Sequence, residues 1–171
     1  MDTISLMLHV TAAAVLVGPQ VLMFLAVTPA TWLVDDERLK RDLVRVVAGR
    51  FGMLAGASLV VLLLTGLYQF YFYVPEAIQE NMMDYRFGIV FVVKMSLFTV
   101  LVLLIFAHMI FFSRRIARLS DAVLAGEADP GTLEYARMQS FLFSVLLLLV
   151  SIAVLWLGVA LGDHEYARLP R

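Results

Sequence analysis

Residues 87–112 read FGIVFVVKMSLFTVLVLLIFAHMIFF and contain a single charged side chain, Lys94. A helix rises about 1.5 Å per residue, so about 20 apolar residues cross the roughly 30 Å hydrocarbon core of a bilayer. This stretch is long enough to cross, and its continuous apolar run lacks the alternation of a membrane β-strand. It therefore predicts a transmembrane helix.

Three further stretches of the chain are free of charge. No Asp, Glu, Lys or Arg lies between Asp2 and Asp35, between Arg50 and Glu76, or between Arg137 and Asp163. We therefore expect four transmembrane helices, at about residues 4–32, 51–74, 87–112 and 138–162. The fold class that follows is all-α: an integral membrane four-helix bundle, running up-down-up-down as one domain over residues 1–171.

The composition of the whole chain agrees with a bilayer environment. Of its 171 residues, 62% are hydrophobic and 16% charged, whereas average soluble domains are nearer half apolar and a quarter charged. A net charge of −1 gives no electrostatic footprint for nucleic acid, so none is expected as a partner. The absence of cysteine excludes a disulfide framework and a thiolate metal site. The expected partner is the lipid bilayer, with other membrane subunits or a second copy of the chain left open.

Lysine and arginine are concentrated in the first and third loops. The first loop contains Arg38, Lys40, Arg41, Arg45 and Arg50, and the third contains Arg114, Arg115, Arg118 and Arg137. The opposite side has only Arg86 in its loop, with Arg168 and Arg171 in the tail. The positive-inside rule then places both basic loops in the cytoplasm and both termini outside, as in a multi-pass protein of the cytoplasmic (inner) membrane. The first span starts with an acidic residue and is about twice as long as a signal-peptide core, so we expect it to remain in the mature protein.

The two basic loops also predict local structure. Residues 36–47 carry apolar side chains on one helical face and charges on the other, which predicts a short helix lying on the membrane surface. Asp129 and Pro130 are an expected N-cap and first-turn proline. The last helix should therefore begin well before it enters lipid.

Each expected span carries one stripe of small and polar residues. In lipid, such stripes mark the faces on which helices pack, since apolar side chains gain little by leaving lipid for protein. The stripes comprise His9, Ala13, Leu16 and Gln20; Ser58, Thr65 and Gln69; Lys94 and His108; and Ser144, Ser151, Gly158 and Gly162. For the serine, threonine and glycine members we expect helix packing.

His9 and Lys94 are the main candidates for a site, because an ionisable residue inside a span is costly and suggests function. At helical rise His9 lies about 8 Å and Lys94 about 10 Å below the outer surface, so the two can meet. His108 lies roughly 20 Å deeper than Lys94 and cannot share a metal ion with His9. The alternatives are a lysine that extends to the headgroups and histidines that only hydrogen-bond within the bundle.

Methionine and a third histidine accompany this level of the bundle. Met7 and Met95 lie towards the outer side, and thioether and imidazole groups together suit Cu(I). His164 follows the last span and joins His9 as a cofactor-binding candidate if that helix tilts. No carboxylate lies inside a span, which argues against a proton-relay pump.

Several short motifs resemble the CopD-type copper resistance and export family. They are Leu8-His9-Val10 with the following alanines and Gly18, Arg50-Phe51, Leu64-Thr65-Gly66-Leu67, Val93-Lys94-Met95 and Arg114-Arg115. The resemblance covers nearly the whole chain and implies a copper-handling membrane protein, with His9 and Lys94 as the matching site residues. The copper ion would then be held by His9, Met7 and Met95, with Lys94 beside it.

The same histidine and lysine also resemble the four-helix HemJ-type protoporphyrinogen oxidases, in which this pair is associated with haem b. That resemblance implies a b-type haem protein with His9 as an axial ligand and Lys94 as the other ligand or the partner of a propionate. The chain lacks the tryptophan that precedes the histidine in that family. A third interpretation is a structural subunit of a respiratory assembly. Whether the protein is an enzyme is left open; an enzyme of this kind would be a haem-dependent membrane oxidoreductase.

Overall fold

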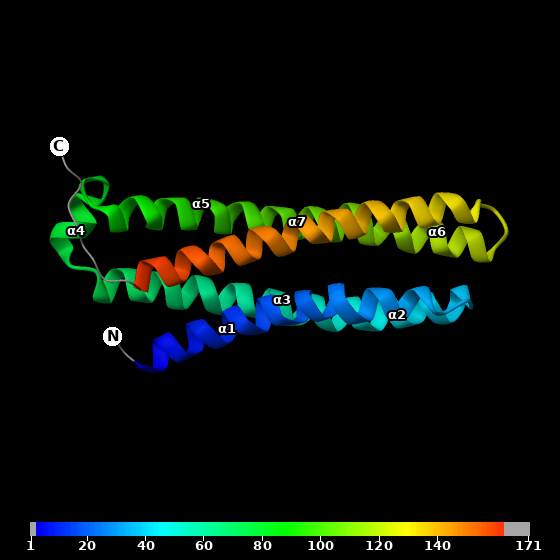
Figure 1. The fold of residues 1–171 in the computed structure, drawn as a ribbon, viewed down its shortest axis with the longest axis horizontal. Helices are drawn as coiled ribbons and strands as arrows, with labels where there is room; N and C mark the ends of the chain where they lie inside the picture. The colour runs from blue at the N-terminus through cyan, green and yellow to red at the C-terminus, as the bar shows by residue number, and fades with distance from the viewer. Residues whose placement is uncertain (1–2, 163–171) are drawn as a thin grey trace.

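Four long helical rods form the molecule (Figure 1), and the computed structural model describes residues 3–162. The first rod joins α1 (Thr3–Leu22), the π-helical η1 (Met23–Val27) and α2 (Thr28–Trp32). The second is α3 (Glu37–Tyr73), the third joins α5 (Arg86–Ala107), the π-helical η3 (His108–Ser113) and α6 (Arg114–Leu124), and the fourth is α7 (Pro130–Gly162). Two short helices, α4 (Glu76–Glu80) and η2 (Met82–Asp84), connect the second rod to the third. All four rods are long and apolar enough to cross a membrane, which confirms the all-α four-helix prediction.

The rods pack as two antiparallel pairs. α1 lies along α3 and α5 lies along α7, whereas contacts between the pairs are fewer and run mainly from α1 to α7 and from α3 to α6 (Figure 1). α1 begins and α7 ends at the end of the molecule that carries α4. We call the boundary between the α1–α3 pair and the α5–α7 pair the seam.

Two rods extend further than the apolar stretches predict. α3 runs unbroken from Glu37 to Tyr73, so the expectation of a separate surface helix over 36–47 is wrong. Asp36 starts α3 by accepting hydrogen bonds from the backbone N–H groups of Arg38 and Leu39. No proline follows within the helix to stop it. The third rod likewise continues through η3 into α6.

The start of the last rod agrees with the sequence pattern. α7 begins at Pro130, and Asp129 Oδ2 accepts a hydrogen bond of 3.1 Å from the Thr132 backbone N–H. Proline suits this first turn because its missing N–H would have no carbonyl partner inside the helix. The prediction that this helix begins before the apolar stretch is confirmed.

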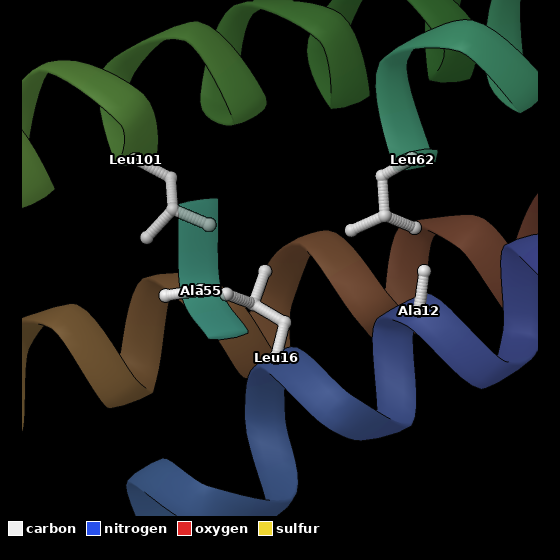
Figure 2. Packing of buried hydrophobic residues seen from close by; sticks show 5 residues of the cluster. All are labelled: Ala12, Leu16, Ala55, Leu62 and Leu101. Atoms are coloured by element: carbon white, nitrogen blue, oxygen red, sulfur yellow. The ribbon is translucent and has the colours of Figure 1, made fainter. Parts of the chain in front are cut away.

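A small apolar cluster occupies the middle of the bundle (Figure 2). Its buried members are Ala12 and Leu16 of α1, Ala55 and Leu62 of α3, and Leu101 of α5. Large apolar side chains are exposed along all four rods. Extensive exposed apolar surface marks a membrane environment, so the few buried side chains mediate helix packing and the rest face lipid.

Polar side chains join the helices at several levels. Gln69 Nε2 donates to Ser5 Oγ at 3.3 Å, and Ser151 Oγ donates to Gln20 Oε1 at 3.1 Å. Within residues 3–162, no buried side-chain nitrogen or oxygen lacks a hydrogen-bond partner. These contacts confirm that the polar stripes lie between helices, as lipid-facing polar groups would remain unsatisfied.

An ion-pair network ties three rods together at the basic-loop end, outside the apolar stretches. Arg137 Nη2 and Ser120 Oγ donate to Glu37 Oε1 at 2.6 and 2.7 Å, respectively. Burial acts to raise the pKa of Glu37, but the hydrogen bonds from Arg137 and Ser120 and the charges of Arg137 and Lys40 outweigh burial and hold that pKa below its usual value. The ionised carboxylate therefore connects α3, α6 and α7.

Candidate functional site

His9 lies on the face of α1 that packs against α3. Its Nδ1 is 2.7 Å from Thr65 Oγ1, and the Thr65 hydroxyl donates to the Val61 carbonyl oxygen at 2.6 Å. Because a hydroxyl has one proton, Thr65 can only accept from the ring. Nδ1 therefore carries the imidazole proton and Nε2 presents its lone pair.

The second ring nitrogen of His9 is open. Among residues 3–162, the His9 ring has one hydrogen-bond partner, Thr65, which contacts Nδ1 and leaves Nε2 without a partner. Within the described residues, every buried side-chain nitrogen or oxygen has a hydrogen-bond partner. Since Nε2 has none, this atom is accessible at the protein surface. A neutral histidine whose one nitrogen donates to a neighbour and whose other nitrogen is free has the arrangement usual for a metal ligand.

Lys94 reaches the same region from the other side of the seam. A Cβ on Gly158 of α7 would lie 3.4 Å from Lys94 Nζ, so the lysine packs directly against that glycine. Gly158 belongs to α7, which contacts α1 across the seam, so Lys94 packs on the rod that meets the rod of His9. Within residues 3–162, every ion pair lies at the basic-loop end of the bundle. No carboxylate of these residues therefore pairs with Lys94.

Apolar layers lie on both sides of this pair. Towards the end of the bundle that carries α4, the rings of Phe70 and Phe91 stack with centroids 4.6 Å apart. Towards the middle of the bundle lies the apolar cluster that contains Ala12 and Leu62, with Phe98 packed against it. Charge in such surroundings is weakly screened, so an anion beside Lys94 would bind more strongly than in water.

Glycine provides close packing at both site residues. A Cβ on Gly66 would lie 3.5 Å from His9 Cε1, as the Cβ on Gly158 would approach Lys94. The sequence stripes predict only packing roles for Thr65 and Gly158, whereas the structure places each against a site residue. Position along the spans could have revealed these contacts, since Thr65 and Gly158 fall in the same half of their spans as His9, counted from the end that carries α4.

The two methionines expected beside His9 lie in different surroundings. Met7 is 64% exposed and, two residues from His9, points about 200° around the helix from it. Met95 is half-buried beside Lys94. Residues 3–162 contain no group of three His, Asp or Glu side chains that could hold a metal ion. Met7 therefore lies on another face of α1 than His9, the copper ligand set of His9, Met7 and Met95 stays a prediction, and His164 lies outside the described residues.

His108 has a packing role that differs from the setting of His9. Its Nε2 lies 3.0 Å from Ser140 Oγ and 3.3 Å from Ser144 Oγ. Its ring stacks against Phe112 and Phe143, with centroids 5.6 and 5.7 Å away. His108, the first residue of η3, thus packs against α7. It is 14 residues along the third rod from Lys94 and lies roughly 20 Å from the level of that lysine.

Comparison with known proteins adds no relative to this picture: no family model, curated protein or solved structure matches the chain. The likeness to CopD-type and HemJ-type proteins therefore rests on the short motifs around His9, Thr65 and Lys94.

Proposed function

We propose that this protein binds haem b in the outer half of the membrane, with His9 Nε2 as an iron ligand and Lys94 as the partner of a propionate or the second ligand. The observation that carries the proposal is the pairing of an open imidazole nitrogen with an ammonium that no described carboxylate neutralises. Histidine is a common axial ligand of haem iron, and a positive charge complements the acidic edge of the porphyrin.

The chain's own residues would bind and orient this group. Thr65 fixes the tautomer and direction of the His9 ring, and Lys94 supplies the charge. The Phe70–Phe91 stack and the apolar cluster exclude water from either side. The seam, where the two pairs of rods make few contacts, is where a flat group would enter. Haem bound here would supply one-electron chemistry.

Copper handling of the CopD type is the second candidate. The open Nε2 of His9 also suits Cu(I), and the half-buried Met95 lies next to the site lysine. The difference between the two candidates is the ammonium of Lys94, which repels a bare cation but attracts an anionic cofactor.

Substitution of Lys94 distinguishes these candidates. The purified wild-type protein is expected to show a Soret band with sharp α and β bands in its reduced-minus-oxidised spectrum. Lys94→Met should weaken haem binding about 10- to 100-fold, because a charged hydrogen bond contributes about 1.5–3 kcal/mol, whereas Lys94→Arg should retain most of the affinity. The measurement is haem retention by absorbance during dilution. A colourless protein that binds Cu(I), and binds it more tightly after Lys94→Met, would establish copper instead; a protein that binds neither would be a structural subunit.

We further propose that the protein lies in the cytoplasmic membrane with both termini outside. The support is the concentration of Lys and Arg at the end of the bundle that carries α6. Because the chain has no cysteine, a thiol reagent can label only the single cysteine that is introduced. In intact spheroplasts a membrane-impermeant maleimide should label Glu80→Cys, whereas Glu127→Cys should react only after the membrane is broken. The reverse labelling pattern would show the opposite orientation.

A further inference from the structure

A basic groove lies on the third rod where its apolar stretch ends. It has a volume of about 400 Å³ and is lined by Ile110, Phe111, Arg114, Arg115, Arg118 and Leu119. These residues recur at intervals of one helical turn, so they share one face of η3 and α6. The groove is at the opposite end of the bundle from His9 and Lys94 and is independent of the proposed haem site.

None of the three arginines of the groove forms an ion pair with another of residues 3–162, and two of them also lack a side-chain hydrogen bond there. Arg115 Nη1 donates to Gln139 Oε1 at 3.0 Å, but within residues 3–162 neither Arg114 nor Arg118 forms an ion pair or a side-chain hydrogen bond. The ion pairs at this end use Arg41 and Arg137 instead. Like charges four residues apart on a helix repel one another. Membrane orientation alone requires positive charge in the loop, not two unneutralised guanidinium groups one turn apart.

The apolar part of the groove lies deeper in the membrane than the arginines. Ile110 and Phe111 are 42% and 68% exposed and stand about one turn before Arg114. The groove therefore presents an apolar surface at hydrocarbon depth followed by cations at headgroup depth. An anionic phospholipid has its acyl chains and phosphate in the same order.

We propose that this groove binds an anionic phospholipid of the inner leaflet, with the phosphate between Arg114 and Arg118 and an acyl chain along Ile110 and Phe111. The planar guanidinium group matches phosphate oxygens with two parallel hydrogen bonds. Basic surfaces at the cytoplasmic end of transmembrane helices recognise acidic headgroups in this way. The lipid then compensates the repulsion between the two arginines.

The test is lipid binding by the full chain in neutral detergent, with bound phosphatidylglycerol counted by native mass spectrometry. Wild-type protein should retain phosphatidylglycerol in preference to phosphatidylcholine. The double variant Arg114→Gln/Arg118→Gln should weaken phosphatidylglycerol binding about tenfold. The matched control Arg38→Gln/Arg45→Gln removes two exposed arginines from the other basic loop and should leave binding unchanged. Equal weakening in both double variants would show that only overall charge matters and would overturn the proposal.

Two further measurements separate the lipid from a free anion and guard against misfolding. Millimolar inorganic phosphate should not displace the lipid; displacement would assign the site to a free phosphate and overturn the lipid assignment. Phe111→Ala keeps both arginines and removes only an exposed apolar contact, so it tests the acyl chain even if the double variant fails to fold. Unchanged lipid binding in Phe111→Ala would contradict the proposed orientation.

Discussion

Replacing His9 with alanine is expected to abolish the haem spectrum of the purified protein while leaving the bundle folded. Among residues 3–162, His9 is the histidine at the end of the bundle where Lys94 lies, and its Nε2 has no hydrogen-bond partner there. The substitution leaves the bond from Thr65 to the Val61 carbonyl in place, so no buried hydroxyl loses its acceptor. The measurement is the reduced-minus-oxidised spectrum at equal protein concentration, with helical content followed by circular dichroism.

Thr65→Val extends the same argument from the ligand to the residue that orients it. Valine has nearly the shape of threonine but cannot accept from His9 Nδ1, so the ring loses its fixed direction. Removal of such an orienting partner typically lowers metal affinity about 10- to 100-fold. Haem affinity should therefore fall by a similar factor in this variant, while its helical content stays unchanged.

His108→Ala is the matched control for the His9 substitution. Like His9, His108 is a histidine inside a rod, here the third, but its Nε2 hydrogen-bonds to Ser140 and Ser144 and its ring is stacked. Its loss should lower stability by about 1–3 kcal/mol yet leave the haem spectrum in place. Loss of the spectrum in His108→Ala but not in His9→Ala would contradict the proposed site.

The spans were predictable from sequence because the constraint that sets them is local. A bilayer requires about 20 uncharged residues in one helix, and this requirement can be counted along the chain. The continuation of α3 beyond its apolar stretch involves contacts between distant residues as well. Glu37, at the start of α3, is bound by Arg137, 100 residues later, and no local pattern near residue 37 reveals that partner. The segment predicted as a surface helix over 36–47 is therefore the first part of α3.

The sequence predicts the level at which the candidate site residues lie along their spans, but not which helix faces meet there. Counting helical rise brings His9 and Lys94 to one level, and the structure packs His9 against Thr65 of α3 and Lys94 against Gly158 of α7. Which faces meet depends on how α1 pairs with α3 and α5 with α7, which periodicity alone leaves open. Met7 is a different case: helical periodicity already puts a residue two positions from His9 on another face. The level of Met7 along the span favours it as a ligand, whereas the helix face on which it lies does not.

Gly88→Ala is expected to destabilise the protein by about 3 kcal/mol, through a clash between two segments of backbone. A Cβ at Gly88 would overlap the carbonyl oxygen of Met82 and lie 2.5 Å from its carbonyl carbon. That oxygen also accepts a hydrogen bond from the Tyr85 backbone N–H at 3.2 Å, so η2 cannot withdraw without losing it. Overpacking costs about 1–3 kcal/mol and a lost hydrogen bond about 1 kcal/mol more. The measurement is the free energy of unfolding in mixed micelles, from titration with a denaturing detergent.

Gly52→Ala is the control that separates this clash from a general effect of replacing glycine in a helix. Gly52 lies within α3 with no atom within 4 Å of a Cβ built there, so alanine should fit freely. Alanine is a better helix former by about 1 kcal/mol, and the control should therefore be neutral or slightly stabilising. Neither glycine has a positive φ, so backbone conformation does not distinguish the two positions. Opposite signs for the two substitutions would locate the effect in the contact between α5 and η2; equal stability of the two variants would show that η2 does not hold its backbone against Gly88.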